Sequence, residues 1–228
     1  MGVVSAAAGL CLASPARAHF ILQVPGSWAA QGSLGDPQKS APCGQADPGT
    51  AAVETDVITY YASGETVTVT INETVPHPGH YRVVLSTTGQ AGLPADPPVT
   101  AGSTPCGSTE IQSPPVFPVL ADGELVHTAA FSAPQSFTFK LPSGVTCADN
   151  CVLQVAEFMS DHGLNNPGGC FYHHCANIRI EAGGGPDAGG HGLAEDDGCQ
   201  CAAGGTRGLG AGVLVLLLLT AVRRRRRP

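Results

Sequence analysis

The chain has 228 residues, of which 11 are Lys or Arg and 18 are Asp or Glu, and its formal net charge is −7. Within residues 19–182 the imbalance is sharper, with four basic against fourteen acidic side chains. A nucleic-acid-binding surface needs Lys and Arg to neutralise phosphates, so this composition argues against that class. Neutral polysaccharides and cationic metals remain compatible partners.

Residues 1–18 predict a signal peptide. They are small and apolar and end in Ala16-Arg17-Ala18, which matches the A-x-A pattern of a cleavage site. We therefore expect an exported protein that begins at His19.

A chain that begins with His19 offers a metal ion two nitrogens from one residue, the free α-amine and the imidazole. The α-amine has an ordinary pKa of about 7.7, so a metal ion can displace its proton near neutral pH. An internal histidine supplies one nitrogen, whereas an N-terminal histidine supplies a chelate.

Residues 19–182 predict one domain that is long enough to bury a hydrophobic core. The pattern is all-β: Glu65–Glu73 alternates strictly, with Val67, Val69 and Ile71 on one face. Short strands separated by Pro and Gly turns favour a β-sandwich with long loops over residues 24–52 and 88–118. Further strands are expected over residues 80–85, 136–141, 152–158 and 177–180.

The domain contains six cysteines, and an even number in an exported chain is typical of disulfides. Six cysteines allow fifteen pairings, and the sequence does not choose among them. A zinc site is the competing interpretation for Cys147 and Cys151 together with Cys170 and Cys175. The oxidising compartment favours disulfides.

The histidines fall into two groups that can carry metal chemistry. His77 and His80 lie in the turn that ends the best predicted strand, and His173 and His174 follow an aromatic pair that leads into the strand at 177–180. Two nitrogens from His19 and one from another histidine would form a T-shaped site that suits copper. Surface or loop positions are expected for the other three histidines, His127, His162 and His191.

Beyond the domain, residues 183–198 predict a Gly-rich linker and residues 199–228 a sorting or anchor segment. An apolar run over residues 209–222 precedes five arginines; at fourteen residues it is shorter than the roughly 20 that a full membrane span needs. With the cysteines at 199 and 201, this tail is similar to the C-terminal sorting signals of myxobacterial surface proteins. The similarity implies a C-terminal hydrophobic helix, processing near the cysteines, and display at the cell surface or release.

The domain resembles lytic polysaccharide monooxygenases, and more closely the polysaccharide monooxygenase-like proteins of myxobacteria. The resemblance rests on an exported chain that begins with His, on a His-x-Gly at a strand end, and on an aromatic residue three positions before a Cys-Ala-x-Ile strand. The matching stretches are HFILQVP at 19–25, DPQKSAPCG at 36–44, TVTINETVPHPGHYRV at 68–83, CVLQVAEFMSDH at 151–162 and CFYHHCANIRI at 170–180.

This resemblance implies an immunoglobulin- or fibronectin-like sandwich that binds one copper ion. His19 would supply its amine and ring nitrogen, His77 the third nitrogen with His80 as the rival, and Tyr172 the axial position. Since side chains alternate along a strand, only His174 of the histidine pair shares a face with Tyr172, as a hydrogen-bond donor beside the metal or a modified ligand.

Two further residues, Glu157 and Gln154, are candidates for a supporting role beside that metal. Trp28, the only tryptophan, could stack on a sugar, but a core position is favoured.

The implied activity is oxidative cleavage of glycosidic bonds at C1 or C4. Its partners would be a polysaccharide of the chitin or cellulose type, an external electron donor, and O2 or H2O2. Two other functions stay open: a non-catalytic copper-binding protein for trafficking or scavenging, and a surface or adhesion domain without a metal.

Overall fold

A computed structural model describes residues 19–47, 50–164 and 169–183. The predicted signal peptide, most of the linker, the tail and His191 lie outside the described residues. Over the part of the chain that the structure describes, no helix is long and apolar enough to cross a membrane.

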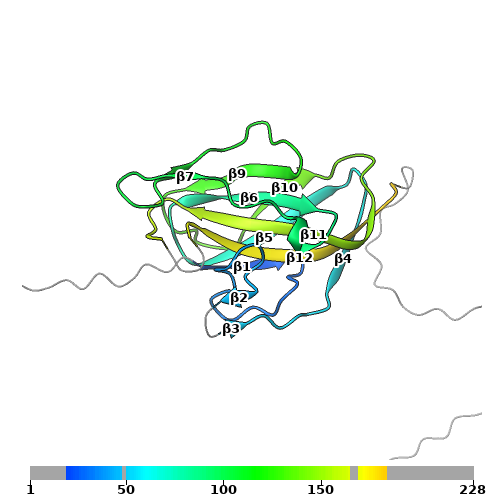
Figure 1. Cartoon of the computed structure of the whole chain (residues 1–228), viewed down its shortest axis with the longest axis horizontal. Helices are drawn as coiled ribbons and strands as arrows, with labels where there is room; N and C mark the ends of the chain where they lie inside the picture. Colours follow the sequence, from blue (N-terminus) through cyan, green and yellow to red (C-terminus); the bar gives the residue numbers. More distant parts are fainter. Residues whose placement is uncertain (1–18, 48–49, 165–168, 184–228) are drawn as a thin grey trace, which may run out of the picture. The chain divides into compact units, whose positions relative to one another are not determined.

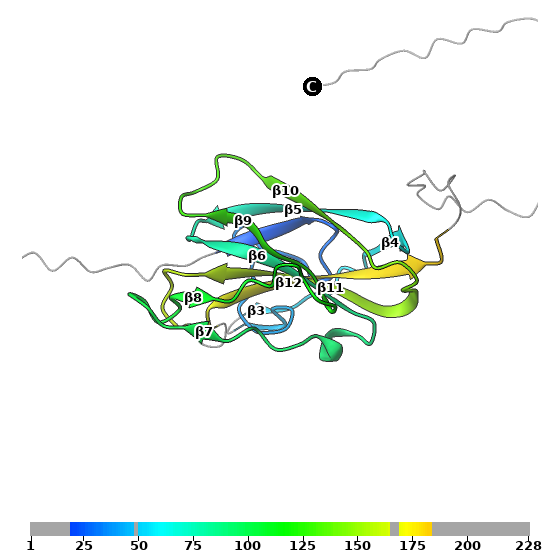
Figure 2. The same ribbon diagram turned by 90° about the horizontal axis from the view of Figure 1, so that it is seen from above.

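The described residues form two main β-sheets and two short two-stranded ribbons, which confirms the all-β sandwich (Figures 1 and 2). The smaller sheet has the strand order β1-β5-β10 and is antiparallel throughout. The larger sheet has the order β4-β12-β11-β6-β9, in which only the β12–β4 pair is parallel. The bounds are β1 His19–Val24, β5 Thr66–Val75 and β10 Gln135–Lys140 for the first sheet, and β4 Ile58–Ala62, β12 Phe171–Glu181, β11 Cys147–Met159, β6 Gly79–Ser86 and β9 Val119–His127 for the second.

The two long loops carry only short elements, as their composition predicts. The first loop holds the ribbon of β2 and β3, and the second holds η1 and the ribbon of β7 and β8. In Figure 2, β3, β7 and β8 lie on the side of the larger sheet that faces away from β5 and β10. The bounds are β2 Ala46–Asp47, β3 Thr50–Ala51, η1 Gln90–Gly92, β7 Val99–Thr100 and β8 Ser108–Thr109.

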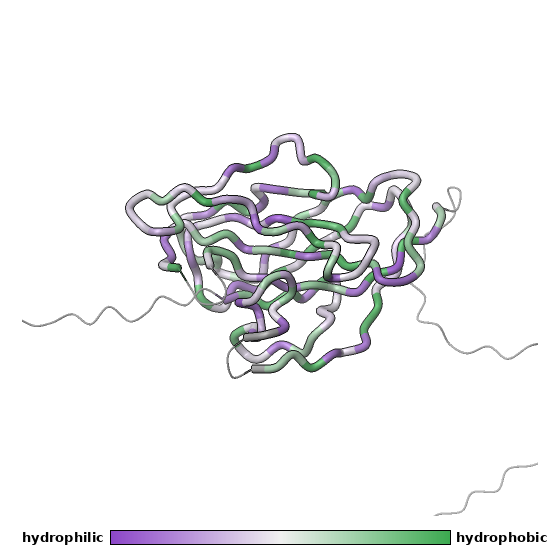
Figure 3. Tube along the Cα trace, in the orientation of Figure 1, coloured by the Kyte–Doolittle hydropathy of each residue, from purple (hydrophilic) through white to green (hydrophobic). Residues whose placement is uncertain are grey.

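The core between the sheets follows from the period-2 pattern. In β5, Val67, Val69 and Ile71 are buried while Thr66 and Thr68 are exposed. Figure 3 shows the resulting change between hydrophilic and hydrophobic residues along the strands. Burying each such aliphatic side chain stabilises the fold by about 1.5–3 kcal/mol. From the larger sheet, the same core receives Tyr81, Val83, Leu85, Leu153, Val155, Tyr172, Ala176, Ile178 and Ile180.

The outer face of the larger sheet is buried as well, because the long loops cover it. Every residue of β6 is buried; its inner face is apolar, whereas its outer face carries His80 and Arg82, which lie beside the buried Asp122 side chain. A second cluster gathers Trp28 and Val152, and a third gathers Phe158 and Phe171. Trp28 donates its indole N–H to the Cys43 carbonyl at 3.1 Å, which confirms its core position.

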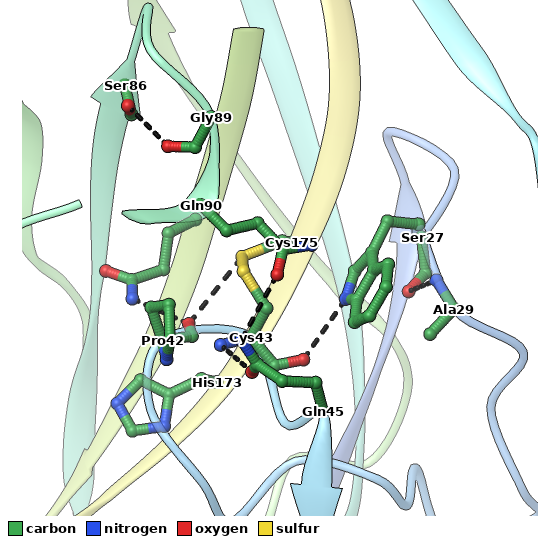
Figure 4. Close-up of a disulfide and its surroundings, with 12 residues drawn as sticks. Ser27, Ala29, Pro42, Cys43, Gln45, Ser86, Gly89, Gln90, His173 and Cys175 are labelled. Atoms are coloured by element: carbon green, nitrogen blue, oxygen red, sulfur yellow. Dashed lines mark hydrogen bonds between the residues drawn. A yellow bond between two sulfur atoms is a disulfide. The ribbon is translucent and has the colours of Figure 1, made fainter. Parts of the chain in front are cut away.

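Three disulfides join the six cysteines of the domain: Cys43–Cys175, Cys106–Cys170 and Cys147–Cys151. The alternative of a four-cysteine zinc site is therefore wrong, since its four members lie in three different bridges. Figure 4 shows the Cys43–Cys175 bridge, which fixes the first long loop to β12 beside His173.

Candidate metal centre

Six strand ends meet at one edge of the sandwich. His19 at the start of β1 pairs with Val75 at the end of β5, and Gly79 at the start of β6 pairs with Met159 and His127. Phe158 near the end of β11 pairs with Phe171 at the start of β12. This topology brings residues far apart in sequence to the same edge.

His19 is buried, and hydrogen bonds with two other segments of the chain fix the backbone of His19 and Phe20. The Phe20 N–H donates to Gln38 Oε1 at 3.1 Å, and the Thr74 hydroxyl lies 3.0 Å from the His19 carbonyl oxygen. Gly35, with φ +102°, allows the close approach of this loop, because a Cβ there would lie 1.9 Å from the Phe20 oxygen. The first residue of β1 is thus fixed before any metal binds.

The imidazole of His19 lies near a carboxylate and an aromatic ring. Its Nε2 lies 3.4 Å from Asp36 Oδ1, and its ring centroid is 5.4 Å from that of Tyr172. The other ring nitrogen, Nδ1, is the one close enough to the residue's own backbone nitrogen to form a chelate with it. The arrangement fits a metal held by the Nδ1 of His19 and an α-amine at the same residue.

His77 lies in the turn between β5 and β6, with its Nδ1 2.6 Å from Asp161 Oδ1. The segment that carries Asp161 is fixed to this turn, because Ser160 donates both its N–H and its hydroxyl to the Pro78 carbonyl at 2.8 and 2.9 Å. A carboxylate that accepts one imidazole N–H fixes the tautomer and leaves the other nitrogen as a metal ligand. The contact therefore prepares Nε2 of His77 for coordination.

Gly79 explains the His-x-Gly pattern physically. A Cβ at this position would lie 1.8 Å from the Phe158 carbonyl oxygen, so β6 can approach β11 here only without a side chain.

The ring of His80 points to the outer face of the larger sheet, away from the core between the sheets. It packs against Phe158 at 5.2 Å between centroids, and its Nε2 lies 3.8 Å from Asp122 Oδ1. Burial lowers the pKa of His80 below its ordinary value, against the opposing effect of Asp122. Of the two turn histidines, the structure brings His77 and not His80 to the edge where His19 lies.

His162 is a member of this cluster that the sequence pattern did not reveal. Its ring centroid lies 5.0 Å from that of His77 and 6.2 Å from that of Tyr172. Its side chain is buried, and its Nδ1 donates to the Gly163 carbonyl. The prediction of a surface or loop position for His162 is partly wrong, because the residue lies in a loop but is buried. The loop after β11 folds back against the β5–β6 turn, and this follows from the pairing of β11 with β6 rather than from a local sequence pattern.

Tyr172 and His174 share the inner face of β12, as the alternation predicts, but they have different surroundings. Tyr172 is buried and opposes Glu157 across the β11–β12 pair. His174 donates from Nε2 to the Phe20 carbonyl at 2.9 Å, and their rings pack edge to face at 4.7 Å. Burial lowers the pKa of His174 to about 4, so the ring is neutral and ties β12 to the start of β1.

Two other candidates point away from the cluster, toward the outer face of the larger sheet. His173 Nε2 lies 2.8 Å from Asp96 Oδ1. Gln154 donates to the Pro42 carbonyl at 2.8 Å, next to a disulfide. Of the two supporting residues proposed on β11, only Glu157 lies on the face of Tyr172.

The rings of His19, Tyr172, His162 and His77 therefore follow one another in a chain of contacts at one edge. Imidazole nitrogens suit copper and zinc, and a phenol oxygen is a weaker neighbour that can complete an axial position. These contacts place imidazole and phenol groups, of the kinds that copper binds, at the same end of the sandwich.

No protein-family model matches the chain, and no curated protein sequence matches it. Among solved structures, the chain is similar to a lytic polysaccharide monooxygenase AA15 from Thermobia domestica in the Cu(I) state, with 17% identity, a TM-score of 0.47, and coverage of 71% of this chain and 98% of the other. It is also similar to a chitin-binding domain from Burkholderia pseudomallei, with 11% identity, a TM-score of 0.41, and coverage of 71% and 100%. At these values the similarity does not extend to ligands or activity.

Proposed function

We propose that the mature protein begins at His19 and binds one copper ion through the α-amine and Nδ1 of His19 and Nε2 of His77, with Tyr172 at the axial position. The single observation that supports this proposal is the row of ring contacts at one edge of the sandwich, which runs from His19 on β1 through Tyr172 on β12 and His162 to His77 in the β5–β6 turn. Asp36 and Asp161 face the imidazole nitrogens that the metal does not use.

The proposed activity is oxidative cleavage of glycosidic bonds in a polysaccharide of the chitin or cellulose type. A copper ion held in this way would supply one-electron redox chemistry toward O2 or H2O2 at the expense of an external electron donor. The contribution of the chain is to hold the ligands in place: Asp161 fixes the tautomer of His77, and His174 fixes the start of β1.

The surface around the cluster is compatible with a neutral glycan. Leu34, whose carbonyl oxygen contacts the Thr74 hydroxyl beside His19, is exposed, and Leu164, two residues after His162, is exposed as well. The few basic residues of the domain make a polyanionic substrate a poor partner.

A second function is favoured by His162. A third imidazole beside His77 would give copper a fourth nitrogen and fill the position at which O2 would react. The chain would then be a surface or periplasmic copper-binding protein for trafficking or scavenging.

The first test is a Cu(II) titration followed by EPR, on protein with an authentic His19 N-terminus and on protein with one residue left in front of it. We expect tight axial copper in the first and at least a hundredfold weaker binding in the second, since the chelate is lost. Equal, weak binding in both proteins would remove the proposed copper site and leave a surface domain as the better account.

A matched pair of variants tests the third nitrogen. His77→Ala should abolish the axial EPR signal, whereas His80→Ala should preserve it, because His80 faces Phe158 and Asp122. The reverse result would assign the ligand to His80.

Activity separates the two functions. Copper-loaded protein with a reductant and H2O2 is incubated with chitin and with cellulose, and oxidised oligosaccharides are sought by mass spectrometry. Oxidised products support the monooxygenase. Tight copper without products, together with four rather than three nitrogen couplings in the EPR spectrum, supports the non-catalytic protein.

Three disulfides and this fold are consistent with an extracellular protein. We further propose cleavage of residues 1–18 and processing of the tail at residues 199–228, which places the domain of residues 19–182 at the cell surface or in the medium. Mass spectrometry of the protein recovered from cells and from medium tests both ends.

A further inference from the structure

A second cluster of possible ligands lies between the sheets, close to the proposed copper site but separate from its ligands. It consists of Glu73 on β5, His127 on β9 and Glu157 on β11, whose ligand atoms all lie within 4.8 Å of one another. His127 Nε2 lies 2.8 Å from Glu73 Oε1. The cluster therefore joins one strand of the smaller sheet to two strands of the larger one.

The three side chains are more deeply buried than ionisable side chains usually are. Glu157 is 0% exposed, and the side chains of Glu73 and His127 are 1% and 6% exposed. Within the described residues, no N–H or hydroxyl donor reaches either carboxyl oxygen of Glu157 or Oε2 of Glu73, and the two carboxyl groups are close enough to share a proton. The hydroxyl of Tyr81, which is on the same inner face and whose ring is stacked on that of His127, lacks a hydrogen-bond partner among these residues.

The protein does not provide a cationic partner for each of the two carboxyl groups of the cluster. Among the ion pairs of the described residues, His127 is the cationic partner of Glu73, and no Lys, Arg or His pairs with Glu157. A buried carboxylate costs several kcal/mol unless it is paired, neutralised or bound to a metal. Burial, followed by the charge of Glu73 and a hydrogen bond with it, raises the pKa of Glu157 well above its ordinary value.

A divalent cation would satisfy the three side chains of the cluster at once. Two carboxylates neutralise its charge, the imidazole of His127 supplies a nitrogen, and the unpartnered Tyr81 hydroxyl is on the same inner face. Zinc accepts Asp or Glu oxygens and His nitrogens in a tetrahedral arrangement. Copper is less well served, because only one of these donors is a nitrogen.

We propose that Glu73, His127 and Glu157 form a second metal site that binds a zinc-type divalent cation between the two sheets. The site shares no ligand with the proposed copper centre. It lies next to it, since Glu157 opposes Tyr172 and Glu73 is two residues before Val75, the partner of His19. A cation there would tie the sheets together beneath the copper ligands.

The test measures zinc in two forms of the protein, one with the authentic His19 N-terminus loaded with one equivalent of copper, and one with an extra residue in front of His19. Both forms are incubated with Zn²⁺, passed through a desalting column and analysed for metal. We expect about one zinc ion per chain in both forms. The blocked form lacks the α-amine chelate of the proposed copper site, and the variants below distinguish zinc bound at the cluster from zinc bound at the remaining histidines.

Variants then locate the zinc. Glu157→Gln and His127→Gln should lose it, whereas Glu124→Gln, which changes a carboxyl on β9 outside the cluster, should keep it. Zinc at about a hundredfold excess over its Kd should raise the Tm of the unsubstituted protein by roughly 5–10 °C and leave that of Glu157→Gln unchanged.

Glu157→Gln removes a buried carboxyl without changing its size, so the variant is expected to fold. X-ray absorption at the zinc edge should give one imidazole and otherwise oxygen ligands. Absence of zinc from the unsubstituted protein, or equal zinc in all three variants, would overturn the proposal.

Discussion

Replacing Asp161 with Ala should weaken copper binding without removing any copper ligand. Asp161 Oδ1 lies 2.6 Å from Nδ1 of His77 and is the group that fixes its tautomer. Without it, the ring can turn and can place its proton on Nε2, so part of the protein no longer presents a lone pair to the metal.

The expected loss is about tenfold in Kd, or 1.4 kcal/mol. Loss of such a partner costs roughly 10–100-fold, and the lower end applies because the Asp161 side chain is 48% exposed and water can replace part of its contact. Asp161→Asn should lose less than Asp161→Ala, since the amide oxygen still accepts the N–H.

The assay is a competition titration of Cu(II) against a chelator of known affinity, read by EPR. Asp96→Ala is the matched control, because Asp96 makes the same kind of contact at 2.8 Å with His173 and its side chain is 29% exposed. The reasoning fails if Asp161→Ala binds copper as tightly as the unsubstituted protein, or if Asp96→Ala loses as much.

Three further outcomes are expected, each measured by unfolding. Gly79→Ala should destabilise the domain by about 3 kcal/mol in urea, because its Cβ meets a carbonyl oxygen of β11, whereas Gly163→Ala, with nothing within 4 Å, should change little. Replacing both Cys43 and Cys175 with Ala opens a link between residues 132 apart and should cost roughly 5 kcal/mol; an unchanged Tm would contradict this. His80 has a pKa lowered by burial, so the folded state holds it neutral while the unfolded chain protonates it near pH 6.5. Stability is therefore fully present above that pH and is lost as the pH falls toward the folded-state pKa, and His80→Phe should reduce this dependence in metal-free protein.

Strands with strict alternation could be predicted from the sequence, and those with interrupted alternation could not. β5 and β10 pair without a register shift and were predicted nearly at their bounds. β9 was missed, because its pairing with β6 has three register shifts and its sequence contains Gly123. β1 and β4 were missed because each is short and lies at an edge of its sheet.

The site residues also fall into two groups. Some are marked by a local sequence pattern, and others are placed only by contacts between segments that are far apart in the sequence. The His19, His77 and Tyr172 positions are marked by local patterns: a cleavage site, a His-x-Gly turn and an aromatic residue before a cysteine. His162 and Asp161 have no local pattern, and their place depends on the return of the loop after β11 to the Pro78 carbonyl. Long-range pairing of this kind cannot be worked out from one sequence.

The difference between an oxygen-activating site and a copper carrier depends here on one nitrogen. The α-amine and Nδ1 of His19 with Nε2 of His77 would occupy three positions around a tetragonal ion and leave the fourth for O2 or H2O2. His162 donates from Nδ1 to the Gly163 carbonyl, which leaves Nε2 as the ring nitrogen that could bind a metal, and its ring lies beside that of His77. If Nε2 of His162 were a ligand, four nitrogens would hold the copper ion and the protein would serve to bind copper tightly. If it accepts a hydrogen bond instead, the position stays open and the same ring can orient a bound oxidant. The number of nitrogen ligands, rather than the affinity for copper, therefore separates the two functions.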